Sequence, residues 1–67
     1  MDKNIEMILQ YRHREVSMDE VIKRVEEDYK AHGNTDEIKN QEIYVKPEDF
    51  TAYYVINDDV VGKVHLF

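Results

Sequence analysis

The last third of the chain alternates between short apolar runs and turn-forming residues, and this limits the fold more than any other part of the sequence. Three runs predict strands, over residues 42–46, 50–57 and 60–67. Lys46-Pro47-Glu48-Asp49 separates the first two and favours a type I turn, because its proline already has the required φ angle. Asn57-Asp58-Asp59 separates the last two. We therefore expect a three-stranded antiparallel meander.

The segment before the meander carries the signals of one amphipathic helix over residues 18–32. Ser17 and Glu20 have the spacing of a capping box, and Gly33 follows where a left-handed residue ends a helix. The apolar residues recur at helical spacing and form one stripe: Met18, Val21, Ile22, Val25 and Tyr29. A helix of about four turns can cover one face of a small sheet.

Apolar and polar residues alternate from Ile5 to Arg12, and this period of two predicts a first strand. Glu15-Val16 predicts a very short second strand that pairs back on the first. The expected fold is therefore α+β, in the order ββαβββ, with one small antiparallel sheet and one helix packed on one face. A chain of 67 residues cannot support two cores, so we expect a single domain over residues 1–67.

The turn at residues 57–59 decides which side chains share a face of the meander. Two-residue loops at 57–58 and at 58–59 give the same side-chain parity. That parity places six residues on the side that faces the helix: Tyr53, Val55, Val60, Gly62, Val64 and Leu66. The other side should face solvent, yet it is apolar enough to form a patch that another protein could cover. The predicted interface residues are Phe50, Tyr54, Ile56, Val61, His65 and Phe67.

Charge limits the possible partners. Fifteen acidic residues against nine Lys and Arg give a net charge of −6, which opposes contact with nucleic-acid phosphates and with anionic lipid. Solubility is one role for this charge. Another is that an acidic surface imitates a phosphate track, as in phage or mobile-element inhibitors that block a nucleic-acid-binding enzyme. That surface would comprise Glu26, Glu27, Asp28, Asp36 and Glu37.

No pattern in the sequence indicates catalysis or metal binding. There is no cysteine, and His13, His32 and His65 are far apart without metal-ligand spacing. No serine or threonine sits in a nucleophile motif. We therefore expect no enzyme activity, no cofactor and no metal. No apolar run approaches the roughly 18 residues of a membrane span, and no secretory segment follows Met1–Asn4, so we expect a cytoplasmic protein.

Three motifs stand out in the last third: Tyr44-Val-Lys-Pro-Glu48, Ala52-Tyr-Tyr-Val-Ile-Asn57 and Gly62-Lys-Val-His-Leu-Phe67. Together they resemble a family of small proteins from Gram-positive anaerobic bacteria, and upstream segments are similar too. The family has no assigned activity, and the resemblance implies a stand-alone or C-terminal soluble domain. Its members tend to have glycine where this chain has His13, and Asn-Gly where it has Asn57-Asp58, so both turns should be less well specified here.

These observations favour a non-enzymatic interaction module that self-associates or binds a protein partner through the exposed apolar face of its sheet. A homo-oligomer is expected because a chain of 67 residues without disulfides gains burial by association. The alternative function is the acidic inhibitor that mimics nucleic acid.

Overall fold

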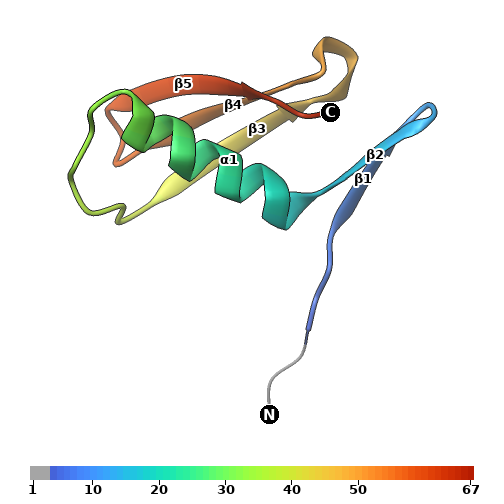
Figure 1. Cartoon of the computed structure of the whole chain (residues 1–67), viewed down its shortest axis with the longest axis horizontal. Helices are drawn as coiled ribbons and strands as arrows, with labels where there is room; N and C mark the ends of the chain where they lie inside the picture. Colours follow the sequence, from blue (N-terminus) through green and yellow to red (C-terminus); the bar gives the residue numbers. More distant parts are fainter. Residues whose placement is uncertain (1–3) are drawn as a thin grey trace.

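A computed structural model describes residues 4–67. Met1–Lys3 lie outside the described residues, and they begin the segment in which no secretory signal was found. The fold is α+β, and its elements follow the predicted order ββαβββ (Figure 1). They are β1 (Ile8–Tyr11), β2 (Arg14–Ser17), α1 (Met18–Ala31), β3 (Gln41–Lys46), the 3-10 helix η1 (Pro47–Asp49), β4 (Thr51–Ile56) and β5 (Val60–His65). Within residues 4–67, no helix is long and apolar enough to cross a membrane.

Helix α1 begins and ends close to the predicted residues. The Ser17 Oγ accepts a hydrogen bond from the Asp19 N–H at 3.2 Å, so Ser17 caps the helix, although through a different amide from the Glu20 amide of the predicted capping box. Asp19 and Glu20 place negative charge in the first turn, where the helix dipole is positive. Gly33 follows the helix with φ +87°, the left-handed conformation that its position predicted.

The strands form two antiparallel sheets, whereas we predicted one. β3, β4 and β5 form the meander, and β1 and β2 form a separate hairpin. The chain path offers a reason, because β2 ends at Ser17 and α1 starts at the next residue, so no loop is present there to bring β2 back beside the meander. The hairpin is joined to the body by side chains instead, since Leu9 and Val16 pack with Ala52 and Leu66.

The core lies between α1 and one face of the meander (Figure 1). From the helix, the stripe that was predicted to be apolar buries Val21, Val25 and Tyr29. From the sheet, the buried residues are Ala52, Tyr54 and Ile56, with Leu66 just after β5. Burial of each large aliphatic side chain contributes about 1.5–3 kcal/mol, so this small set of contacts holds the helix on the sheet.

The structure corrects the predicted faces of β4. Tyr54 and Ile56, predicted to face solvent, are only 2% and 0% exposed beneath α1. Tyr53 and Val55, predicted to face the helix, lie on the opposite side of the sheet. The predicted side was correct for β5, where the half-buried Val60, Gly62 and Val64 line the helix side.

The turn between β4 and β5 explains this error. Ile56 pairs with Val60, so three residues separate the paired positions, whereas we assumed two. Asn57 and Asp58 have φ of 54° and 63°, and the Asp59 N–H donates to the Ile56 carbonyl at 3.2 Å, which is type I′ geometry. Asp59 is then an additional residue before β5, and one additional residue moves every β4 side chain to the other face.

Candidate interaction surface

The meander has a second face, directed away from α1, which we call the open face. The pairing of the strands brings nine side chains onto it: Glu42, Tyr44 and Lys46 from β3; Thr51, Tyr53 and Val55 from β4; Val61, Lys63 and His65 from β5. These residues form three rows across the sheet, because the strands pair in register along their whole length.

The centre of the open face is aromatic and apolar. Tyr44 lies opposite Tyr53, and Val55 lies opposite Val61, so the four side chains are cross-strand neighbours. Tyr44 is 51% exposed, Tyr53 36% and Val61 72%. Large apolar surface therefore remains accessible in the middle of an ordered sheet.

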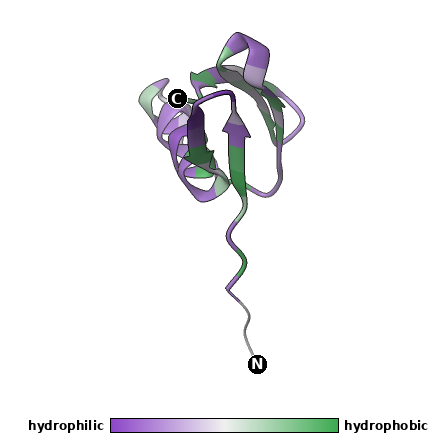
Figure 2. Ribbon diagram, turned by 90° about the vertical axis from the view of Figure 1, so that its right-hand side faces the viewer, coloured by the Kyte–Doolittle hydropathy of each residue, from purple (hydrophilic) through white to green (hydrophobic). Residues whose placement is uncertain are grey.

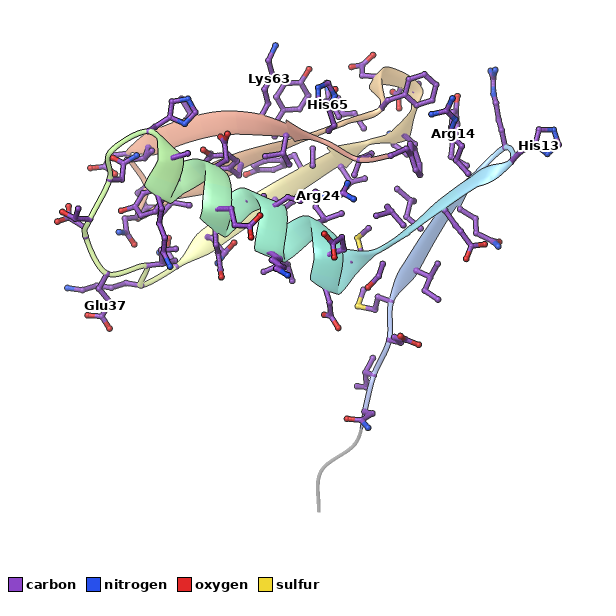
Figure 3. The ribbon with its side chains drawn as sticks, in the orientation of Figure 1. His13, Arg14, Arg24, Glu37, Lys63 and His65 are labelled. Carbon is purple, nitrogen blue, oxygen red and sulfur yellow. The ribbon has the colours of Figure 1, made fainter. Side chains whose placement is uncertain are left out.

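Charges are distributed unevenly around this centre. Lys63 pairs with Tyr53 from one side, and the Lys46 Nζ lies 5.7 Å from the Tyr53 ring centroid on the other, within cation–π range. Lys63 and His65 project beyond β5, on the side away from α1 (Figure 3). Glu42 is the acidic member, and its carboxylate accepts a hydrogen bond from the Tyr44 hydroxyl at 3.2 Å. The negative charge of Glu42 and this bond raise the pKa of Tyr44.

The six predicted interface residues lie in three different places. Val61 and His65 are on the open face. Tyr54 and Ile56 are buried, so they cannot contact a partner. Phe50 and Phe67 lie at the end of the molecule near the hairpin, with ring centroids 6.0 Å apart. The predicted patch is therefore not one surface.

The sequence placed Lys63 on the solvent side correctly, but it did not predict that Tyr44, Tyr53 and Lys46 share that face. Their sequence signal is the length of the turn, because a three-residue turn at Asn57–Asp59 exchanges the two faces of β4 relative to β5. The residues beneath the helix are then Ala52, Tyr54, Ile56, Val60, Gly62 and Val64. The two-residue turn that we assumed left Tyr54 and Ile56 among Lys63 and His65 instead. The three-residue turn instead buries Ala52 and Ile56 and leaves the more polar Thr51 and Tyr53 towards solvent, and this difference favours the longer turn.

A family of unknown function, DUF6465, matches residues 1–66 of the chain. The chain belongs to this family. No curated protein and no solved structure matches the chain. The function of this DUF6465 domain is therefore inferred from its own surfaces.

The five acidic residues of the alternative function do not form one track on the DUF6465 domain. Glu26, Asp36 and Glu37 line a groove between α1 and the following loop, where Lys30 also lies. Figure 3 shows Glu37 on that loop.

Glu27 and Asp28 line a separate groove beside β5, together with two basic residues, Arg24 and Lys63. Two of the five carboxylates also have internal partners. Glu26 accepts from the Gln41 side-chain amide at 3.1 Å, and Asp28 accepts from the Tyr54 hydroxyl at 2.7 Å. The two grooves each mix both signs of charge, which weakens the resemblance to a phosphate track.

Tyr54 and Asp28 are linked between the sheet and the helix, and the exposed side chain of His32 lies beside Asp28. The Tyr54 hydroxyl donates to Asp28 Oδ2 at 2.7 Å, and the His32 Nδ1 lies 3.6 Å from the same oxygen. Burial, with this hydrogen bond and the negative charge of Asp28, raises the pKa of Tyr54 to about 12. A phenol with this pKa is poorly matched to proton transfer near neutral pH. The hydrogen bond from Tyr54 to Asp28 therefore has a structural role, which is to link β4 to α1. In residues 4–67, no three His, Asp or Glu side chains converge to hold a metal ion.

Proposed function

We propose that this DUF6465 domain is a bacterial, cytoplasmic, non-enzymatic module that binds a protein partner through its open face. The observation that carries this proposal is the exposed pair Tyr44 and Tyr53 at the centre of the sheet, with lysines on both sides of Tyr53. Tyrosine is enriched at the centres of protein interfaces, because it adds large contact area and a polar group at a low cost in conformational entropy.

The size of the open face limits the partner. Three strands of six residues give a face of about 14 Å by 20 Å. That is well below the roughly 800 Å² that each partner buries in a standard stable complex. The face therefore fits one short element, and a helix of about four turns has the matching length. We expect a weak and reversible complex.

The charges favour an acidic partner. Lys46, Lys63 and His65 outnumber Glu42 on the open face, although the whole chain carries a net charge of −6. An amphipathic helix with an apolar stripe and flanking Glu or Asp residues complements this pattern. Nucleic acid fits it poorly, because two lysines neutralise few phosphates and the rest of the molecule repels them.

Site-specific photocrosslinking in the source bacterium tests the proposal. A photoreactive amino acid replaces Tyr53 on the open face, Ile22 on the exposed side of α1, or Glu37 on the acidic loop. Ile22 is the matched control, since it is an apolar residue of similar exposure, 39%. We expect a discrete protein adduct from position 53 and none from position 22, and loss of that adduct in the Lys46→Glu/Lys63→Glu variant.

The other outcomes are equally informative. An adduct from position 37 alone would favour the acidic inhibitor and contradict the open-face proposal. Equal adducts from positions 53 and 22, or an adduct that the double charge reversal leaves unchanged, would also contradict it.

A further inference from the structure

One face of β1 continues beyond the body of the domain. Residues 4–7 form an extended arm before β1, and the arm leaves the rest of the molecule (Figures 1 and 2). Ile5 and Met7 in this arm are 73% and 63% exposed. With the period of two of extended chain, they share the face of Leu9 and Tyr11. Those two residues are half-buried, because Leu9 packs into the core and the Tyr11 ring lies 6.2 Å from that of Phe50.

The backbone of this segment also has an open edge. The Met18 N–H donates to the Met7 carbonyl at 2.7 Å, so the polar groups of Met7 point towards β2. These directions alternate along an antiparallel strand, so the backbone groups of Glu6, Ile8 and Gln10 point to the outer edge. No strand in the described part of the chain pairs with that edge. An apolar strand with an open edge is a template for another chain.

The surface of the molecule is larger than that of a compact monomer. The accessible area is 5402 Å², whereas about 4500 Å² is typical for a chain of this mass. The radius of gyration is 12.7 Å, whereas about 11 Å is typical for this length. An extended arm that stands away from the body adds surface in this way, and pairing of the arm with a second chain would cover part of it.

We propose that two copies of the chain pair through this edge as a symmetric dimer, with residues 5–11 of one copy antiparallel to the same residues of the second. The pairing is centred on Ile8, because Ile8 has outward backbone groups and can exchange both hydrogen bonds with Ile8 of the second copy. Met7 then lies opposite Leu9 of the second copy, and Ile5 opposite Tyr11. The half-covered apolar face becomes continuous across a four-stranded sheet.

This register is favoured by the polar residues as well. Centred on Ile8, it places Glu6 opposite Gln10 of the second copy, so two polar side chains meet. A shift of the centre to Met7 would place Glu6 opposite Ile8. The proposal does not depend on the open face, which lies on a different sheet of the molecule.

Solution mass measured by light scattering tests the dimer. We expect the wild type to have twice the 8.1 kDa mass of the chain at high micromolar concentration. The Ile5→Glu/Met7→Glu variant should be a monomer with an unchanged far-UV spectrum, since both side chains are mostly exposed. Ile22→Glu, an equally drastic change on α1, should remain a dimer. A wild-type monomer, or a dimer that the arm variant leaves intact, would overturn the proposal.

A single cysteine tests the register, because the chain has no cysteine of its own. Ile8→Cys should oxidise to a covalent dimer, since hydrogen-bonded antiparallel partners are about 5.5 Å apart, within the range of a disulfide. Ile5→Cys should not, because its two copies would be about 20 Å apart along the strands. Faster crosslinking at position 5 or 7 than at position 8 would overturn the proposed pairing.

A variant of the open face separates this proposal from the proposed function. The Tyr44→Ala/Tyr53→Ala variant should remain a dimer while losing the partner. A monomer produced by that variant would show that the open face is the dimer interface, and would overturn the pairing through β1.

Discussion

Tyr54 connects the two layers of the fold at one point, and its hydroxyl must be protonated to do so. It donates to Asp28, and burial is the main reason that its pKa rises to about 12. The ordinary pKa of about 10 applies in the unfolded chain. Between these values the unfolded chain binds fewer protons, so the free energy of unfolding falls as the pH rises from 10 to 12. Below pH 10 the contribution is complete.

We therefore predict that Tyr54→Phe reduces this pH dependence. Two pKa units correspond to up to roughly 2–3 kcal/mol, so the wild type should lose about that much stability between pH 10 and 12 beyond any loss in the variant. Urea denaturation over this range measures the difference. The pKa of Tyr29, raised by burial, affects both proteins and cancels in the comparison. Equal slopes would show that the Tyr54 hydroxyl is not held in its protonated form by the fold.

Tyr54 lies opposite Gly62 on β4, and its ring fills the space that a side chain at position 62 would need. A Cβ at position 62 would lie 2.5 Å from the Tyr54 Cζ, and Tyr54 is too well buried to move away easily. We predict that Gly62→Ala destabilises the domain by about 1–3 kcal/mol, measured by urea denaturation. In a Tyr54→Ala background the same methyl group should cost nothing. An equal cost in both backgrounds would exclude the steric explanation.

At Asp58 the backbone conformation favours glycine, although the sequence has aspartate. Its φ of 63° suits glycine better than aspartate, and type I′ turns favour Asn-Gly. We predict that Asp58→Gly stabilises the domain by up to about 1 kcal/mol and that Asp58→Ala destabilises it. Asp58→Asn controls for the loss of charge. A drop in the denaturation midpoint with Asp58→Gly would contradict this interpretation of the turn.

At the scale of elements, the β1–β2 hairpin is held on the body by its apolar contacts with the core and by aromatic contacts around Phe50. The Phe50 ring lies between those of Tyr11 and Phe67, at 6.2 and 6.0 Å, and the Arg14 guanidinium lies 5.2 Å from it. We predict that Phe50→Ala loosens the hairpin while the meander stays folded. Hydrogen exchange should accelerate at the Leu9 and Val16 amides and remain unchanged in β4. A uniform acceleration would show that hairpin and meander unfold together.

The sequence predicted those elements whose signals are local. Helix α1 has a cap at Ser17, a stripe of apolar residues and Gly33 at its end, and each signal acts within a few residues. The position of the hairpin was not predictable in this way. It depends on the direct junction of β2 with α1 and on contacts between Tyr11 and Phe50, which are distant in sequence.

The candidate site was predicted only where the strand parity was right. Val61 and His65 were placed on the correct side because β5 was read correctly. Tyr54 and Ile56 were misplaced because one residue in the turn, Asp59, reverses the whole of β4. One wrong turn residue therefore misplaces every side chain of the strand, because the register decides which face each of them occupies.

At the scale of the whole molecule, the dimer edge and the open face belong to different sheets, so both can be occupied at once. A dimer would then present two open faces, and binding to a dense array of partner molecules would be stronger than binding to one. We predict that Ile5→Glu/Met7→Glu lowers retention on a surface with many copies of the partner but leaves the one-to-one affinity unchanged. Surface binding at two partner densities measures this. Equal losses at both densities would indicate that the arm itself contacts the partner.

The contact between Gly62, Tyr54 and Asp28 also constrains how relatives can diverge. Any residue larger than glycine at position 62 occupies the space of the Tyr54 ring, and without that ring Asp28 no longer has its buried donor. The three positions should therefore change together among DUF6465 sequences, with loss of the glycine accompanied by a smaller residue at 54 and a free choice at 28. Because they lie on one helix and two strands, far apart in the chain, their covariation would record in sequence how the helix is attached to the sheet.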